Sequence, residues 1–290
     1  MSRKIFLIVL SAVMILSLTA CVMEFDNAGS IISGALKEYK ETVDLSDKYQ
    51  GGQTMKLDLD MKLAKAVVSS TDDKLADVEF AYSAEVLRPE FTVKDDEISI
   101  KNRLERFSFG KPVNKWDVKL TDKLPFDVRL RADASDIRLD MGGMMVDSMD
   151  AKLSASSAKL YFDEPNKETL DKFKLDAAAS SVDIYGAGNI DFEVMDIDAD
   201  ASKITVDLTG KNKRDGEVRI NADASTVKLK LPENVGIRIV MDKYEISSVR
   251  INNSEILSRS DKEYVSKNYE DTERTLKIYA DLNVTTLTIE

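Results

Sequence analysis

The stretch Leu130-Arg131-Ala132-Asp133-Ala134-Ser135-Asp136-Ile137-Arg138-Leu139 decides the fold of this chain, because its pattern recurs at a nearly fixed interval. An apolar residue is followed, mostly at alternate positions, by small residues such as Ala and Ser and then by two more apolar residues. Further copies start at Leu153, Leu175, Ile197 and Ile220, so successive starts lie 23, 22, 22 and 23 residues apart. A period of this kind predicts a solenoid of stacked strands rather than one closed core.

Apolar and polar residues alternate within each copy, which indicates strands with one face turned inward. The residues two positions before each copy are also apolar: Val128, Ala151, Phe173, Met195 and Val218. Small residues in the middle of each copy predict a narrow corner where two sheets converge. We therefore predict an all-β fold, a single-stranded β-helix with coils of about 22–23 residues, over residues 127–290.

An earlier region has a different pattern. A first copy of the repeat lies at 57–70, and clean alternation follows at 78–86, 98–100 and 116–120, a region that holds the only tryptophan, Trp116. An uncapped solenoid end would leave backbone donors and acceptors unpaired. We therefore predict that residues 53–126 form a distinct N-terminal β module that packs on the solenoid or caps it.

The repeat weakens after Leu231. Short apolar runs at 237–239 and 246–251 are followed by a polar loop at 258–273 and by a last pair of strands at 276–282 and 287–289. The order of these segments in the sequence predicts that the last pair closes the second end of the solenoid.

The beginning of the chain resembles a bacterial lipoprotein signal peptide. Arg3 and Lys4 precede an apolar run over 5–18, and Leu18-Thr19-Ala20-Cys21 follows directly. The resemblance implies that residues 1–20 are removed and that Cys21 carries the lipid, with 21–52 as lipidated cysteine and tether. The alternatives are an uncleaved anchor or a secretory signal with an unrelated cysteine, but the run is shorter than the roughly 20 residues a membrane span needs. The expected location is the cell membrane, lipid-anchored on its extracytoplasmic face.

The chain is acidic and contains no histidine. Its 290 residues include 52 Asp and Glu against 41 Lys and Arg, a net charge of −11, so nucleic acid is an unfavourable partner. Without histidine the chain lacks the usual general base and metal ligand, and one cysteine allows neither an internal disulfide nor a cysteine zinc site. We expect no enzymatic activity and no cofactor. A polysaccharide-cleaving enzyme with paired aspartates is the alternative, but strand alternation already explains the aspartates.

Asp196, Asp198 and Asp200 are the candidate residues for a weak surface cation site, since hard cations favour clustered carboxylates. On a strand the three side chains share one outward face, beside stacked aspartates of neighbouring coils, and a loop-turning glycine is missing. A solvated face with cross-strand ion pairs is the preferred interpretation, so no metal is expected. The outward column that would supply these pairs is Arg129, Lys152, Lys174, Asp196 and Arg219.

With these features together, the chain resembles the bacterial toast-rack family, an N-terminal toast-rack module followed by an adhesin-like β-helix. The segments that carry the resemblance are 57–61, Asn114-Lys115-Trp116-Asp117-Val118-Lys119-Leu120, Leu124-Pro125, the Ala-Ser corners and Asn268-Tyr269-Glu270-Asp271. Members usually have glycine at the corners, where this chain has Ala-Ser. The resemblance implies a protein of the cell envelope, related in fold to proteins of antibiotic-induced envelope stress, and brings no catalytic residues.

The expected function is therefore that of a non-enzymatic envelope lipoprotein that presents a solenoid surface for interaction. Its partners would be the membrane, through the lipid, and an envelope protein or further copies of itself. A regulator of envelope-stress signalling and a self-associating structural or adhesive module are the two alternatives.

Overall fold

The computed structural model describes residues 36–45, 49, 53–104, 112–211, 213–243 and 246–290. The predicted leader 1–20, Cys21 and most of the predicted tether lie outside these residues. Within them the fold is all-β, as predicted, with two sheets and the short 3-10 helices η2 (Glu85–Leu87) and η3 (Ala187–Asn189). No helix in the described part of the chain has the length and apolar character that a membrane span requires.

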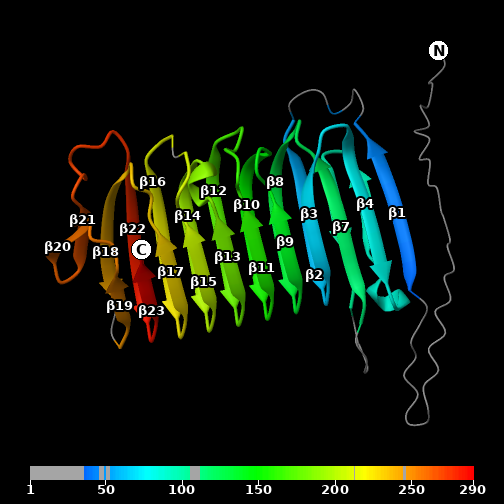
Figure 1. The fold of residues 1–290 in the computed structure, drawn as a ribbon. Helices are drawn as coiled ribbons and strands as arrows, with labels where there is room; N and C mark the ends of the chain where they lie inside the picture. The colour runs from blue at the N-terminus through cyan, green and yellow to red at the C-terminus, as the bar shows by residue number, and fades with distance from the viewer. Residues whose placement is uncertain (1–35, 46–48, 50–52, 105–111, 212, 244–245) are drawn as a thin grey trace, which may run out of the picture.

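The two sheets face each other along the whole solenoid (Figure 1). Sheet A has the order β1 (Lys37–Asp44), β4 (Lys74–Tyr82), β7 (Asn114–Thr121), β3 (Lys65–Thr71), β9 (Asp136–Asp140), β11 (Ser157–Tyr161), β13 (Ser181–Tyr185), β15 (Lys203–Asp207), β17 (Thr226–Lys230), β23 (Thr286–Ile289), β19 (Ser248–Ile251). Sheet B has the order β20 (Ile256–Ser260), β21 (Glu263–Ser266), β18 (Gly236–Lys243), β22 (Thr275–Asn283), β16 (Gly216–Asp223), β14 (Phe192–Asp200), β12 (Leu170–Ala178), β10 (Met145–Ser154), β8 (Pro125–Asp133), β2 (Met55–Lys62), β6 (Glu97–Lys101), β5 (Glu90–Lys94).

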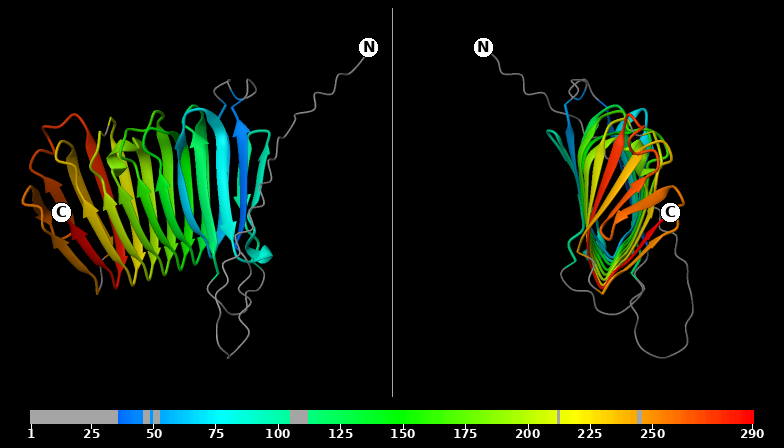
Figure 2. Two further views of the ribbon diagram at one scale, coloured as in Figure 1. Left: turned by 45° about the vertical axis from the view of Figure 1, so that its right-hand side comes forward. Right: turned by 90° about the vertical axis from the view of Figure 1, so that its left-hand side faces the viewer.

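Each coil contributes one strand to sheet B, a sharp corner, and one strand to sheet A. The end-on view in Figure 2 shows the sheets converging at these corners. Inward side chains stack in columns across the parallel strands, and one such column holds Leu57, Val128, Met149, Phe173, Met195, Val218 and Ile278, all buried. Burying each large aliphatic side chain contributes about 1.5–3 kcal/mol, so the columns provide the main stabilisation of the coils.

The register of the coils differs from the sequence alignment at one copy. Leu153 pairs with Ala132, and Ala151 is the residue that pairs with Leu130. The second copy was therefore aligned two residues out of register. The corner residues lie 21, 24, 22 and 23 residues apart, at Ala134, Ala155, Ala179, Ala201 and Ala224. A shift of two residues keeps the side chains within the strands on the same faces, so apolar alternation could not reveal the error. Only the corner differs, because Ala155 is exposed whereas Ala132 is buried.

The corner residues were expected to be small for steric reasons, and the structure corrects this. Ala179 and its equivalents point outward into solvent with a left-handed backbone, φ near 49°. Leu63 and Val284 occupy the same position in other coils, with φ of 51° and 50°, so a larger side chain fits there. Left-handed backbone is unfavourable for non-glycine residues, so other contacts must hold these corners.

The residue after each corner alanine supplies those contacts. The side chains of Ser135, Ser156, Ser180, Ser202, Ser225 and Thr285 are buried and form a continuous hydroxyl ladder. In each step a hydroxyl oxygen accepts a bond from the backbone N–H of the preceding coil's serine, as from Ser156 N to Ser180 Oγ at 3.1 Å. The same hydroxyl donates to the carbonyl two residues earlier, 2.8 Å away for Ser180 and Ala178. A hydroxyl side chain, serine or threonine, is therefore required at this position for hydrogen bonding.

The N-terminal end continues the same two sheets. Strands β2 and β3 form a coil that pairs in parallel with β8 and β9, so neither sheet breaks at the predicted boundary between residues 126 and 127. Antiparallel strands then end both sheets, β4 and β1 in sheet A and β5 in sheet B. Residues 37–44, predicted to be tether, form β1 and belong to the folded body. Glu41 on the inward face of β1 interrupts the alternation of apolar and polar residues, so this strand could not be predicted from the sequence.

The other end departs from the order of the sequence. Strands β22 and β23 were expected to close the solenoid, but they lie between the coil of β16 and β17 and the coil of β18 and β19. The predicted polar loop at 258–273 also contains structure, since β20 and β21 form an antiparallel hairpin beside β18. The end of the solenoid is thus built from residues 236–243 and 246–266 (Figures 1 and 2).

Candidate functional surfaces

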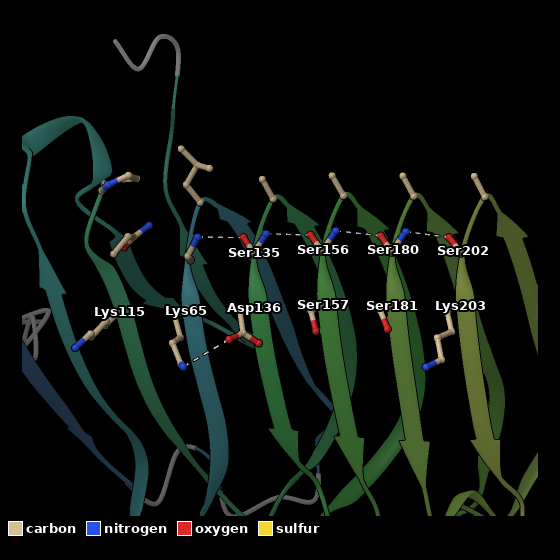
Figure 3. Close-up of a pocket in the computed structure, with 18 of the residues that line it drawn as sticks. Lys65, Lys115, Ser135, Asp136, Ser156, Ser157, Ser180, Ser181, Ser202 and Lys203 are labelled. Atoms are coloured by element: carbon tan, nitrogen blue, oxygen red, sulfur yellow. Dashed lines mark hydrogen bonds and ion pairs between the residues drawn. The ribbon is translucent and has the colours of Figure 1, made fainter. Parts of the chain in front are cut away.

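A long, shallow groove of about 960 Å³ runs beside the corners on the sheet A side (Figure 3). Its walls are the outward corner alanines and the first outward residues of the sheet A strands, among them Ser157, Ser181 and Lys203. Within the same row, Lys65 of β3 forms an ion pair with Asp136 of the neighbouring strand β9, at 3.5 Å. The ladder hydroxyls also border this groove, but they turn inward and are fully engaged with backbone groups (Figure 3). The groove therefore offers small, mostly uncharged side chains and no activated nucleophile.

The outer face of sheet B carries columns of charged residues. One column reads Asp58, Arg129, Asp150, Lys174, Asp196, Arg219 and Tyr279, so acid and base alternate from strand to strand. Lys152, predicted to lie in this column, lies in the next one, because its copy of the repeat was misaligned. Exposed ion pairs of this kind contribute only about 0–1 kcal/mol each, and their main effect is to oppose misaligned strand pairing.

The candidate cation residues Asp196, Asp198 and Asp200 all lie on β14 and point outward, as predicted. Asp196 is paired with Lys172 at 3.0 Å and with Arg219 at 3.8 Å. Asp198 accepts a bond from the Asn221 amide at 3.3 Å. No group of three potential ligands gathers at one point among the described residues. Spacing by two along one strand separates the carboxylates, and two neighbouring bases, Lys172 and Arg219, already pair with Asp196.

Two aspartates on the outer faces have a lowered pKa. Burial by itself would raise the pKa of Asp176, but the ion pairs with Lys174 and Lys152, at 3.3 and 3.4 Å, outweigh burial and lower it. Partial burial likewise opposes the ionised form of Asp207, whereas bonds from Thr209 and Lys230 lower its pKa. Because the pKa is lower in the folded chain than in the unfolded chain, these groups stabilise the fold at neutral pH. That contribution is lost as the pH falls through the folded-state pKa.

Calcium is expected to leave the melting temperature of the protein unchanged. The carboxylates of β14 are separated along the strand and partly neutralised by Lys172 and Arg219, whereas calcium needs six or more converging oxygens. A thermal melt with millimolar calcium, compared with the same ionic strength of sodium chloride, checks this. A rise in melting temperature that disappears in Asp198→Asn would contradict the expectation.

Two segments that depart from the repeat, around Trp116 and at 163–172, contribute to the packing and hydrogen bonding of the fold. Trp116 is buried in the core, and its indole N–H donates to Asn114 Oδ1 at 2.8 Å. The charged excursion at 163–172 is fixed by Asn166, whose buried amide bonds both the N–H and the carbonyl of Val146, at 2.9 and 2.7 Å. Asn166 thus replaces a missing strand neighbour. Asparagine within a charged segment gives no sequence signal for this role, because the burial of Asn166 is visible only in the structure.

The geometry defines an all-β solenoid with charged outer faces, a polar hydroxyl ladder and a shallow groove. Residues 32–185, more than half of the chain, match the family described as the N-terminal domain of toast_rack, DUF2154. The chain therefore belongs to the toast-rack family, as its sequence predicted. A comparison with curated proteins finds no significant match.

The solved structures that this chain matches are only distantly similar to it in sequence. A candidate cell adhesion protein from Clostridium sporogenes ATCC 15579 is 18% identical, with a TM-score of 0.41, over 88% of this chain and 98% of that chain. A candidate adhesin from Bacteroides fragilis NCTC 9343 is 11% identical, with a TM-score of 0.38, over 88% and 97% of the two chains. These similarities are too distant to define a function.

Proposed function

We propose that this chain is a non-enzymatic lipoprotein of the cell envelope, anchored through Cys21, whose solenoid presents an interaction surface outside the membrane. The observation that carries the proposal is the combination of a lipoprotein-like leader with a folded body that starts soon afterwards, at β1. A lipid on Cys21 would leave the segment before Lys37 to link the body to the bilayer.

The absence of an evident catalytic constellation in the described residues supports a binding role. Many charged side chains on the outer faces form ion pairs with one another, as Lys152 does with Asp176 and Lys172 with Asp196, and the buried hydroxyls bond to backbone groups. A catalytic site needs a nucleophile or base held ready for a substrate, usually in a concave pocket. The long groove and the charged faces instead offer extended contact, which is the common use of solenoid surfaces.

Substitution Cys21→Ser is expected to abolish lipid attachment and release the protein from membranes. Without the thiol no thioether can form, and the described body contains no membrane-spanning helix to replace it. Labelling of cells with an alkyne fatty acid, followed by membrane fractionation, measures both effects. Met23→Ser, two residues further along, is the matched control and should stay labelled. Label that persists in Cys21→Ser would count against the proposal.

A further inference from the structure

The last strand of sheet A, β19, has a free edge. Within the described part of the chain, β19 pairs only with β23, and it is the final strand in the order of the sheet. The N–H groups of Ser248 and Asn252 donate to carbonyls of that neighbour, Thr285 and Ile289, at 2.9 and 2.8 Å. Backbone groups alternate in direction along a strand, so the N–H and C=O of Val249 and Ile251 point to the free edge.

The two ends of sheet A differ in how they are protected. At the N-terminal end, edge strand β1 turns the half-buried Glu41 inward, and an inward charge opposes pairing with another strand. At β19 the inward residues are Val249 and Ile251, both partly exposed, and nearby Ile246 is 88% exposed. Among the described residues, three of the five exposed large hydrophobic side chains lie at this end: Ile246, Leu257 and Val284.

We propose that β19 pairs antiparallel with β19 of a second copy of this chain, with Val249 opposite Val249, so that sheet A continues from one molecule into the other. In this register the two Val249 residues exchange both backbone hydrogen bonds, and Ser248 lies opposite Arg250. The inward apolar side chains of both copies then meet on one face. Each molecule contributes its own β19, and after pairing this edge is no longer available to a third molecule. The result is a closed dimer of two-fold symmetry.

Charge selects this arrangement over two others. A shift of the register by one residue pair would place Arg250 directly opposite Arg250, and like charges at opposed positions are destabilising. Head-to-tail pairing of β19 with β1 of another molecule would place Glu41 beside Val249 and Ile251 in an apolar interface, where an unpaired carboxylate is costly. Neither penalty arises when Val249 is at the centre. The contact is independent of the lipid anchor, so it goes beyond the proposed function.

Cysteine cross-linking of the full chain in its membrane tests the pairing. Opposed residues that do not share hydrogen bonds lie about 4.5 Å apart between Cα atoms, within the range a disulfide spans. Ser248 and Arg250 are exposed and outward, so cysteine there leaves the core intact. The double variant Ser248→Cys with Arg250→Cys is expected to give, under mild oxidation, a disulfide-linked species of twice the mass of the chain. Each single variant should stay monomeric, because two copies of one position lie too far apart.

The matched control is Thr226→Cys with Lys228→Cys on β17, which occupies the same outward columns but is flanked by strands on both sides. This control should not cross-link. A dimer formed by Arg250→Cys alone would overturn the proposal, since it requires Arg250 to face its own copy. Failure of the double variant to cross-link, or equal cross-linking of the control, would overturn it as well.

Discussion

Removal of residues 275–290 is expected to unfold the whole C-terminal end of the solenoid, including residues 236–266 that the truncated chain retains. Strand β22 pairs along its length with both β16 and β18, and β23 does the same between β17 and β19. Five large aliphatic side chains would be lost from the core: Leu276, Ile278, Leu282, Leu287 and Ile289. Each contributes about 1.5–3 kcal/mol, so the loss is a large fraction of the 5–15 kcal/mol that usually stabilises a domain.

Hydrogen exchange measured by mass spectrometry gives the readout for the truncation. Amides of 236–266 should exchange at nearly the rate of an unfolded peptide, while amides of β10 and β11, several coils away, keep their protection, because coils depend mainly on their neighbours. If the coils instead stacked in the order of the sequence, β18 would pair with β16 and 236–266 would stay protected from exchange in the truncated chain. That result would contradict the prediction.

Substitution Ser202→Ala is expected to lower the free energy of unfolding by about 1–3 kcal/mol, the usual cost of leaving a buried backbone donor without its partner. Ser202 Oγ accepts a bond from the N–H of Ser180 at 3.0 Å, and its single O–H is shared between the carbonyls of Asp200 and Ala177, at 2.8 and 3.0 Å. Alanine fits the space, but its methyl group can neither accept nor donate these hydrogen bonds. Urea denaturation, followed by circular dichroism, measures the change.

Two further variants separate the loss of hydrogen bonds from a general effect of substitution. Ser181→Ala changes an exposed serine next to the ladder and should shift stability by less than about 0.5 kcal/mol. Ser202→Thr should retain most of the stability, because Thr285 already occupies the equivalent position and its hydroxyl bonds the Ala222 carbonyl at 2.9 Å. Equal losses in Ser202→Ala and Ser181→Ala would show that the ladder does not stabilise the corners.

The repeat in the sequence was sufficient to predict strands, their inward apolar faces and, in every copy except the one that starts at Leu153, the position of the corner. Val182 and Ile184, for instance, are buried as the alternation requires, and the bend falls at Ala179 and Ser180. This works because the pleat of a strand sends alternate side chains to opposite faces whatever the neighbouring strand is. The outward position of Asp196, Asp198 and Asp200 followed from the same rule. The role of serine did not, because a hydroxyl that bonds another coil's backbone leaves no periodic signal beyond its smallness.

What the sequence determined by itself is therefore the local geometry of the repeats: an all-β solenoid, its approximate coil length and the inward face of the repeat strands. Only the tertiary structure decided which strands are neighbours. Leu153 pairs with Ala132 rather than Leu130, β1 joins the body despite Glu41, and the coil of β22 and β23 is inserted before that of β18 and β19. The physical reason is that parallel strands with the same alternation are interchangeable as neighbours. The choice among them depends on how side chains stack between coils and on the reach of the connecting loops.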